Sequence, residues 1–250
     1  MILPLSLIFT LFCGQQDATS IASSAIEATR KQASYHAQFE AVIKMPQGDP
    51  YEISGESVWV NPGVLYIRYT GSGKDEKRIV RVGEKVWIYH EFLEDWVTAE
   101  EMGNGGAGRG VQNPEDVLRV LFDHLENATL GETTNSITPI TVALTGKDIE
   151  TIMKEQANQS SFDWKKSRAS IVLLVKEGKV KGLQSAAALV SNDPNIEGQV
   201  ITYTAEVTVL SFNGVKKLNF EVKNEESGKT EPIPIPDYLE KVIQEYVTKK

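Results

Sequence analysis

Residues 35–69 read YHAQFEAVIKMPQGDPYEISGESVWVNPGVLYIRY, and this stretch decides the predicted fold. In residues 35–45, the apolar Tyr35, Ala37 and Phe39 alternate with polar residues. A period of two is typical of a strand with one face buried. Turn-forming residues follow twice, at residues 46–50 and 61–63, and separate this strand from two more. We therefore predict antiparallel strands at residues 35–45, 51–60 and 64–69.

The pattern of short strands continues along the chain. Further strands are predicted at residues 78–82, 85–89, 95–98, 137–144, 169–176, 182–189, 199–211 and 217–222. Helical periodicity predicts helices at residues 19–34, 113–127, 148–156 and 237–249. Residues 225–228 and 232–236 have the composition of an extended linker. Strands joined by hairpin-length turns favour one antiparallel sheet over βαβ units. The predicted class is α+β, mainly β, with one domain over residues 19–250.

Composition excludes several classes of protein. The chain has 250 residues with 26 Lys and Arg against 34 Asp and Glu, a net charge of −8. This charge argues against general binding to nucleic acid or to anionic lipid surfaces. The single cysteine, Cys13, excludes a disulfide framework and a cysteine-based zinc site. A chain of this length can bury enough surface to fold without either.

The N-terminus has the character of an export signal. Residues 2–12, ILPLSLIFTLF, form an apolar run that is too short to span a bilayer. The run matches the core of a secretory signal, although the usual basic residues before it are missing. We expect residues 1–18 to be a signal segment and the mature protein to reach the periplasm or cell envelope. Cys13 is a candidate for lipidation and membrane anchoring, although Phe12 is bulky where lipoprotein processing prefers a small residue. A buried N-terminal helix is the alternative.

Catalytic and metal-binding patterns are sparse. His36, His90 and His124 are far apart and have no zinc-site spacing. His36 falls on the polar phase of its strand and is expected to be solvated. The glycine-rich residues 103–110 lack the lysine of a phosphate-binding loop, so a connector is the favoured interpretation. We expect no enzymatic activity, no cofactor and no metal.

Three aromatic motifs carry a family resemblance. They are G-E-x-x-W-x-x-P followed by a tyrosine (Gly55 to Tyr69), V-x-x-G-x-x-V-W-x-Y (Val80 to Tyr89) and L-x-x-W-V (Leu93 to Val97). Over residues 19–100 the chain resembles the LolA-like superfamily of periplasmic lipoprotein carriers. The later part is similar to the mycobacterial LppX/LprG branch of that superfamily. There a helix like that at residues 117–125 precedes a strand ending in Thr-Gly, here Thr145-Gly146.

The resemblance implies a half-open antiparallel β-barrel with helices covering its concave face and an apolar cavity that shelters acyl chains. The residues it suggests for that cavity are Phe39, Trp59, Leu65, Ile67, Tyr69, Trp87, Tyr89 and Leu121. For each of them, an ordinary place in the core is the alternative. The chain departs from the lipoprotein carrier at Asn61, where the carrier has an arginine before the proline of the turn. Acyl binding is therefore the property carried over, not a strict shuttle between membranes.

The function expected from the sequence is that of an exported, non-enzymatic carrier or binding protein. Its expected partners are the acyl chains of a lipid or lipoprotein and an envelope membrane receptor, with no nucleic acid. Two alternatives stay open on the same fold. One is an envelope sensor or protein-interaction domain, and the other is a structural protein whose barrel is filled by its own side chains.

Overall fold

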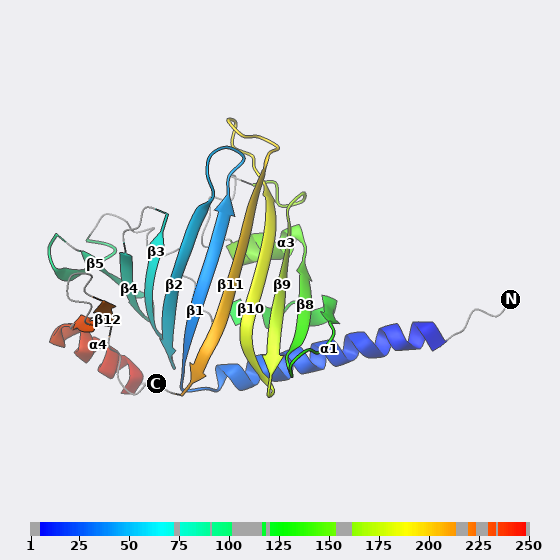
Figure 1. The fold of residues 1–250 in the computed structure, drawn as a ribbon, viewed down its shortest axis with the longest axis horizontal. Helices are drawn as coiled ribbons and strands as arrows, with labels where there is room; N and C mark the ends of the chain where they lie inside the picture. The colour runs from blue at the N-terminus through cyan, green and yellow to red at the C-terminus, as the bar shows by residue number, and fades with distance from the viewer. Residues whose placement is uncertain are drawn as a thin grey trace.

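One large antiparallel sheet organises the protein (Figure 1). The computed structural model describes residues 6–72, 76–90, 92–101, 117–118, 121–153, 162–213, 220–223, 230–233 and 235–248. The sheet has eleven strands in the order β6-β5-β4-β3-β2-β1-β11-β10-β9-β8-β7, and every neighbouring pair is antiparallel. It does not close, because β6 and β7 are edges. The predicted mainly-β, half-open fold is confirmed.

The strands begin and end close to the residues that the alternation of apolar and polar side chains predicted. Their bounds are β1 Ser34–Lys44, β2 Tyr51–Val60, β3 Val64–Gly71, β4 Glu76–Val82, β5 Lys85–His90, β6 Asp95–Thr98, β7 Ala128–Leu130, β8 Thr138–Leu144, β9 Arg168–Lys176, β10 Lys179–Val190 and β11 Val200–Phe212. Among these eleven strands, only β7 was not predicted. It has three residues, too few to show a period of two.

Two further strands form a separate ribbon. β12 (Phe220–Lys223) pairs with β13 (Thr230–Ile233) in a two-stranded sheet. The prediction of a linker is therefore wrong at Pro232 and Ile233, which pair with β12. Prolines in the sequence Pro-Ile-Pro-Ile-Pro concealed this strand, because proline lacks the amide donor that a central strand requires.

The first helix, α1 (Ser6–Arg30), is longer than predicted at its start and shorter at its end. A helix start at Thr19 was predicted, but the helix is continuous from Ser6 through that position. Thr19 does not cap the helix. Its hydroxyl donates to the carbonyl oxygen of Leu125, 2.8 Å away. Ser34, the predicted last residue of the helix, already belongs to β1.

The main core lies between α1 and strands β7–β10. Ala22, Ala25 and Ile26 of α1 are almost fully buried against Ile140 and Leu173 of the sheet. The alanines let the helix lie close to the strands, because their side chains are small. The pairing register places Leu173, Leu183, Val207 and Phe39 on one face of the sheet, which we call the α1 face.

The last helix, α4 (Asp237–Thr248), packs on the opposite side of the same sheet. Its Leu239 and Ile243 contact Val64, Tyr66 and Val80 of β3 and β4. The register places these three residues on the face opposite Leu65 and Ile79, and we call it the α4 face. Strands β3 and β4 carry apolar side chains on both faces, so both need cover. Helix α1 therefore covers one face of the sheet and α4 covers the opposite face of β3 and β4.

The predicted helix at residues 113–127 is described only in part. Residues 117–118 and 121–122 are helical, and a short 3-10 helix, η1 (Leu125–Asn127), follows. Leu118, Leu121 and Leu125 are buried against α1 and strands β7–β9. The remaining residues of the predicted helix lie outside the described part of the chain.

A capping interaction defines the start of α3 (Gly146–Met153). The Thr145 hydroxyl and backbone amide donate to Oδ2 of Asp148 over 2.6 and 2.7 Å. His124 Nδ1 lies 3.2 Å from Oδ1 of the same carboxylate. Partial burial acts to raise the pKa of Asp148, but the two Thr145 hydrogen bonds and the charges of His124 and Lys147 lower it more, so its pKa lies below the usual 3.8.

Replacement of the Asp148 carboxylate should lower the free energy of unfolding only at pH values at which the wild-type carboxylate is ionised. A group whose pKa is lowered by folding stabilises the fold above its unfolded pKa, and the contribution disappears as the pH falls through the folded value. We expect Asp148→Ala to lower the free energy of unfolding by about 1 kcal/mol at pH 7. The difference from wild type should shrink below about pH 4. Urea unfolding at pH 7, 5 and 3 measures it, and a gap that widens in acid would contradict the assignment.

Candidate functional site

Three rows of side chains cross the α1 face of the central strands. The first row is Val207, Phe39, Gly55 and Tyr69, on β11, β1, β2 and β3 in turn. The second row is Val209, Ala37, Ser57 and Ile67, and the third is Phe212, Tyr35, Trp59 and Leu65. Each row therefore brings together residues from both ends of the sequence.

The third row closes one end of this surface. Tyr35, Trp59 and Leu65 are buried and form a small core of their own. The rings of Tyr35 and Trp59 stack with centroids 5.3 Å apart and planes 17° from parallel. Ile67, Val209 and Phe212 pack against this cluster and are themselves only partly buried.

The other two rows, together with Phe212 at the β11 end of the third row, leave apolar side chains partly exposed. We call this surface the apolar strip and define it by its large members: Phe39, Ile67, Tyr69, Val207, Val209 and Phe212. Between them, β2 contributes only Gly55 and Ser57. Burial raises the pKa of Tyr69, and nearby Tyr51 raises it further, so the phenol stays neutral. The strip is therefore uncharged and apolar across four strands.

Five of the eight predicted cavity residues lie on this surface. Phe39, Ile67 and Tyr69 belong to the strip, and Trp59 and Leu65 belong to the buried cluster at its end. Leu121 is fully buried in the main core beneath α1. The expectation that Leu65, Ile67 and Tyr69 share one face is confirmed by the pairing of β2 with β3.

Trp87 and Tyr89 lie elsewhere. β5 pairs with β4 so that Trp87 faces the same way as Val80, on the α4 face. Tyr89 packs beside it against Trp96, with ring centroids 5.6 Å apart. Motif spacing cannot show which face a strand presents, because that depends on its register with the next strand. The eight residues therefore do not line a single surface.

Three strip residues were not among the predicted site residues. Val207, Val209 and Phe212 come from β11, far along the sequence from the aromatic motifs. The alternation of residues 199–211 placed Val207 and Val209 on one face of a predicted strand. It did not identify β1 as the neighbouring strand, since pairing between distant segments leaves no local pattern.

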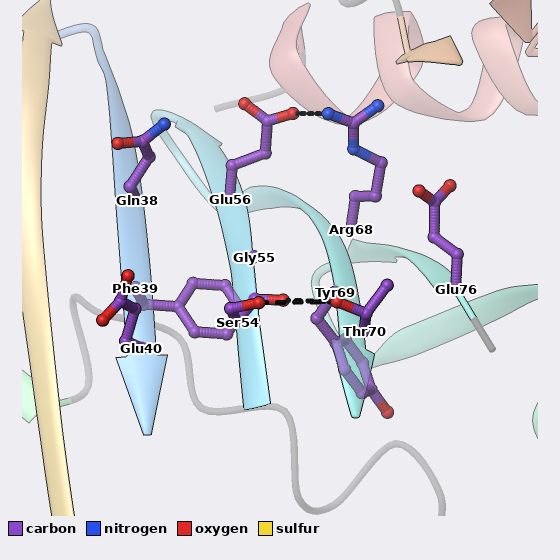
Figure 2. A pocket seen from close by; sticks show the side chains of 10 residues that line it. All are labelled: Gln38, Phe39, Glu40, Ser54, Gly55, Glu56, Arg68, Tyr69, Thr70 and Glu76. Atoms are coloured by element: carbon purple, nitrogen blue, oxygen red, sulfur yellow. Dashed lines mark hydrogen bonds and ion pairs between the residues drawn. The ribbon is translucent and has the colours of Figure 1, made fainter. Parts of the chain in front are cut away.

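A second surface, on the α4 face, is polar. A hollow of about 370 Å³ is lined there by Gln38, Glu40, Ser54, Glu56, Arg68, Thr70 and Glu76, with Phe39, Gly55 and Tyr69 beneath (Figure 2). Figure 2 shows the side chains of Glu56 and Arg68 pointing toward each other, and they form an ion pair. Nε2 of His36 lies 2.9 Å from the other carboxylate oxygen of Glu56.

His36 was predicted to be solvated. Its side chain is 30% exposed and is also paired with Glu56, a contact that was not predicted. Polar side chains of neighbouring strands therefore contact one another here, because Glu56 of β2 pairs with both His36 of β1 and Arg68 of β3. Because carboxylates, a guanidinium and hydroxyls line this hollow, it does not suit an acyl chain.

The described residues contain no group of three or more His, Cys, Asp or Glu side chains arranged for a metal ion. Cys13 lies within α1, upstream of the first described core residue, Ala18. Asn61 is exposed in the turn between β2 and β3, and its amide donates to the carbonyl oxygen of Ala33. Lipidation of Cys13 stays a prediction.

Among the described helices, none combines the length and the apolar character that a bilayer span requires. Removal of residues 1–18 as a signal segment also stays a prediction. Described contacts between α1 and the rest of the protein begin at Ala18, the last residue of that predicted segment, which is fully buried in the main core, and continue at Thr19 and Ala22.

No protein-family model matches the sequence, and no curated protein matches it either. Solved structures with a similar fold include the lipoprotein LppX of Mycobacterium tuberculosis, at 12% identity and a TM-score of 0.46, covering 81% of this chain and 98% of that one. LprF of Mycobacterium bovis matches at 10% identity and 0.46, over 81% and 95%. A LolA superfamily protein of Nitrosomonas europaea matches at 9% and 0.34, over 76% and 91%. These matches agree with the LolA-like and LppX-like resemblance in the sequence, and at these identities the likeness concerns the fold alone.

Proposed function

We propose that this protein binds the acyl chains of a lipid or lipidated protein along the apolar strip. The observation that supports this proposal is the strip itself. Its six large uncharged side chains stay partly exposed on the α1 face of β11, β1 and β3. The same face is covered by α1 over β7–β10. An apolar surface left partly open beside a covered one favours a ligand or partner.

The energetics of acyl transfer fit such a surface. Each methylene moved from water into an apolar site gains about 0.8 kcal/mol, so a long acyl chain gains on the order of 10 kcal/mol. Flat rings such as those of Phe39 and Tyr69 supply large contact areas without a charge. No covalent chemistry is needed for this role, and the protein acts as a binding protein or carrier, not as an enzyme.

The setting that we propose is the cell envelope. The apolar residues 2–12 support export, and Cys13 offers an acylation site that would hold the protein at a membrane. An acyl carrier acts between membranes or at their surface, so the proposed location and the proposed ligand agree. A membrane receptor is the second partner that this role requires.

The test is acyl binding by the protein and by Ile67→Gln. Ile67 lies in the middle of the strip, beside Ser57 on β2 and Ile79 on β4. A polar amide there should weaken the binding of a fluorescent fatty acid about tenfold or more, because it removes apolar contact and brings a desolvation cost. The free energy of unfolding should fall by only about 1–3 kcal/mol, since the position is partly open to solvent.

Val172→Gln is the matched control. Val172 is also half-buried in a central strand, but it lies on the α4 face of β9, away from the strip. This variant should keep wild-type affinity. A wild type that binds no acyl probe, together with a strongly destabilised Ile67→Gln, would instead favour a barrel filled by its own side chains. Full acyl binding by Ile67→Gln would place the ligand on another surface.

A further inference from the structure

Two lysines lie over one aromatic ring at a corner of the apolar strip. Nζ of Lys179 lies 5.4 Å from the centroid of the Phe212 ring, and Nζ of Lys181 lies 4.6 Å from it. Phe212 is the strip residue nearest the end of β11, and it packs against the buried cluster of Tyr35, Trp59 and Leu65. Two positive charges therefore meet the apolar strip at one defined place.

The backbone that carries these lysines is held in position. They lie at the start of β10, just after the hairpin tip at Glu177 and Gly178, both of which have positive φ. A register shift between Val180 and Gly182 sets Lys181 outside the regular pairing with β9. The amide of Val180, between the two lysines, donates to the buried Thr29 hydroxyl of α1 over 2.8 Å. The hairpin is thus fixed to the helix at this point.

The charges of the two lysines are not balanced within the described part of the protein. Neither ammonium group has a described carboxylate within ion-pair distance, although the chain as a whole has a net charge of −8. Both side chains are half-buried. Partial burial strengthens electrostatic interactions, so two like charges that share one ring favour an anion beside them.

We propose that Lys179 and Lys181 bind the anionic head group of an acyl ligand, a carboxylate or a phosphate, whose chain lies along the apolar strip. This inference rests on the proposed acyl binding and adds the ligand class. The Phe212 ring lies where the two parts of such a ligand meet, since both ammonium groups lie over it and it packs against the same buried cluster as Val209 and Ile67 of the strip. A charge-assisted contact to an oxyanion is stronger than a contact between neutral groups.

The experiment compares acyl ligands that differ only in the head group. Binding of a fatty acid and of the fatty alcohol with the same chain is measured by calorimetry, and lysophosphatidic acid is compared with the matching monoacylglycerol. The double variant K179Q/K181Q should bind the fatty acid or the lysophosphatidic acid about tenfold more weakly than wild type. Its affinity for the neutral ligands should stay unchanged, and the difference between charged and neutral ligands should shrink in high salt.

K44Q/K85Q is the control, because it removes the same charge from two exposed lysines at the end of β1 and the start of β5. It should bind all four ligands as wild type does. Loss confined to the fatty acid or to the lysophosphatidic acid identifies which oxyanion the lysines bind. Equal binding of charged and neutral ligands by wild type overturns the head-group site and leaves the proposed acyl binding intact. A wild type that binds none of the four ligands overturns both.

Discussion

Gly55→Ala should be among the most destabilising single substitutions in this protein. A methyl group at Gly55 would overlap the backbone carbonyl oxygen of Arg68 and would lie 2.7 Å from Cβ of Tyr69. Neither the carbonyl nor Cβ can move without shifting β3, because both belong to or adjoin the backbone. We expect a loss of about 3 kcal/mol in the free energy of unfolding. Acyl binding should fall as well, since the change pushes Tyr69 out of its row.

Ser57→Ala is the control for this substitution. Ser57 lies two residues along β2 on the same face and already carries a Cβ atom. Its replacement should change the free energy of unfolding by less than about 1 kcal/mol. Urea unfolding followed by circular dichroism compares the two variants. If Gly55→Ala unfolds at the same urea concentration as wild type, the close approach of β2 and β3 at Gly55 is wrong.

Trp59→Ala should produce the second large effect. Trp59 is completely buried, stacks on Tyr35 and closes one end of the apolar strip. Truncation would leave a cavity against Leu65 and Tyr35, so we expect a loss of about 3–5 kcal/mol. Because the buried cluster supports Ile67, Val209 and Phe212, acyl binding should weaken even where the variant stays folded.

Trp59→Phe separates the packing of the ring from its polar group. The indole Nε1 of Trp59 is buried, and no described group accepts a hydrogen bond from it. Replacing the indole with a phenyl ring therefore breaks no described hydrogen bond and removes an unsatisfied donor. This gain offsets part of the lost packing. We expect a loss of about 1 kcal/mol, well below that of the alanine variant. Equal losses for the two variants would mean that the indole nitrogen has a partner that contributes to stability.

The strands were predictable because their signal is local. β2 and β6 begin and end at the predicted residues, and β1 differs by one residue at each end. Alternation along a strand reflects burial of one face, so it appears within a window of a few residues. The grouping of Leu65, Ile67 and Tyr69 on one face followed from the same rule and holds in the structure.

The start of α1 was not predictable in the same way. Residues 6–18 change from apolar to polar without an amphipathic period, so the helix start was placed at Thr19 instead of Ser6. β13 was missed for a related reason, since its proline argued against pairing. In both segments the local composition is typical of a different feature, a signal segment at residues 6–18 and a linker at β13.

The sequence by itself determined the fold class, ten of the eleven strands of the sheet and the apolar side of each central strand, because these depend on periodicity within a segment. The tertiary structure decided which strand faces lie together on one surface of the sheet. It placed Trp87 and Tyr89 beneath α4, away from Phe39 and Ile67, and it brought Val207 and Val209 of β11 beside β1. It also set Lys179 and Lys181 over Phe212. These outcomes depend on register and strand order, which arise from contacts between residues far apart in the chain and leave no periodic trace in the sequence.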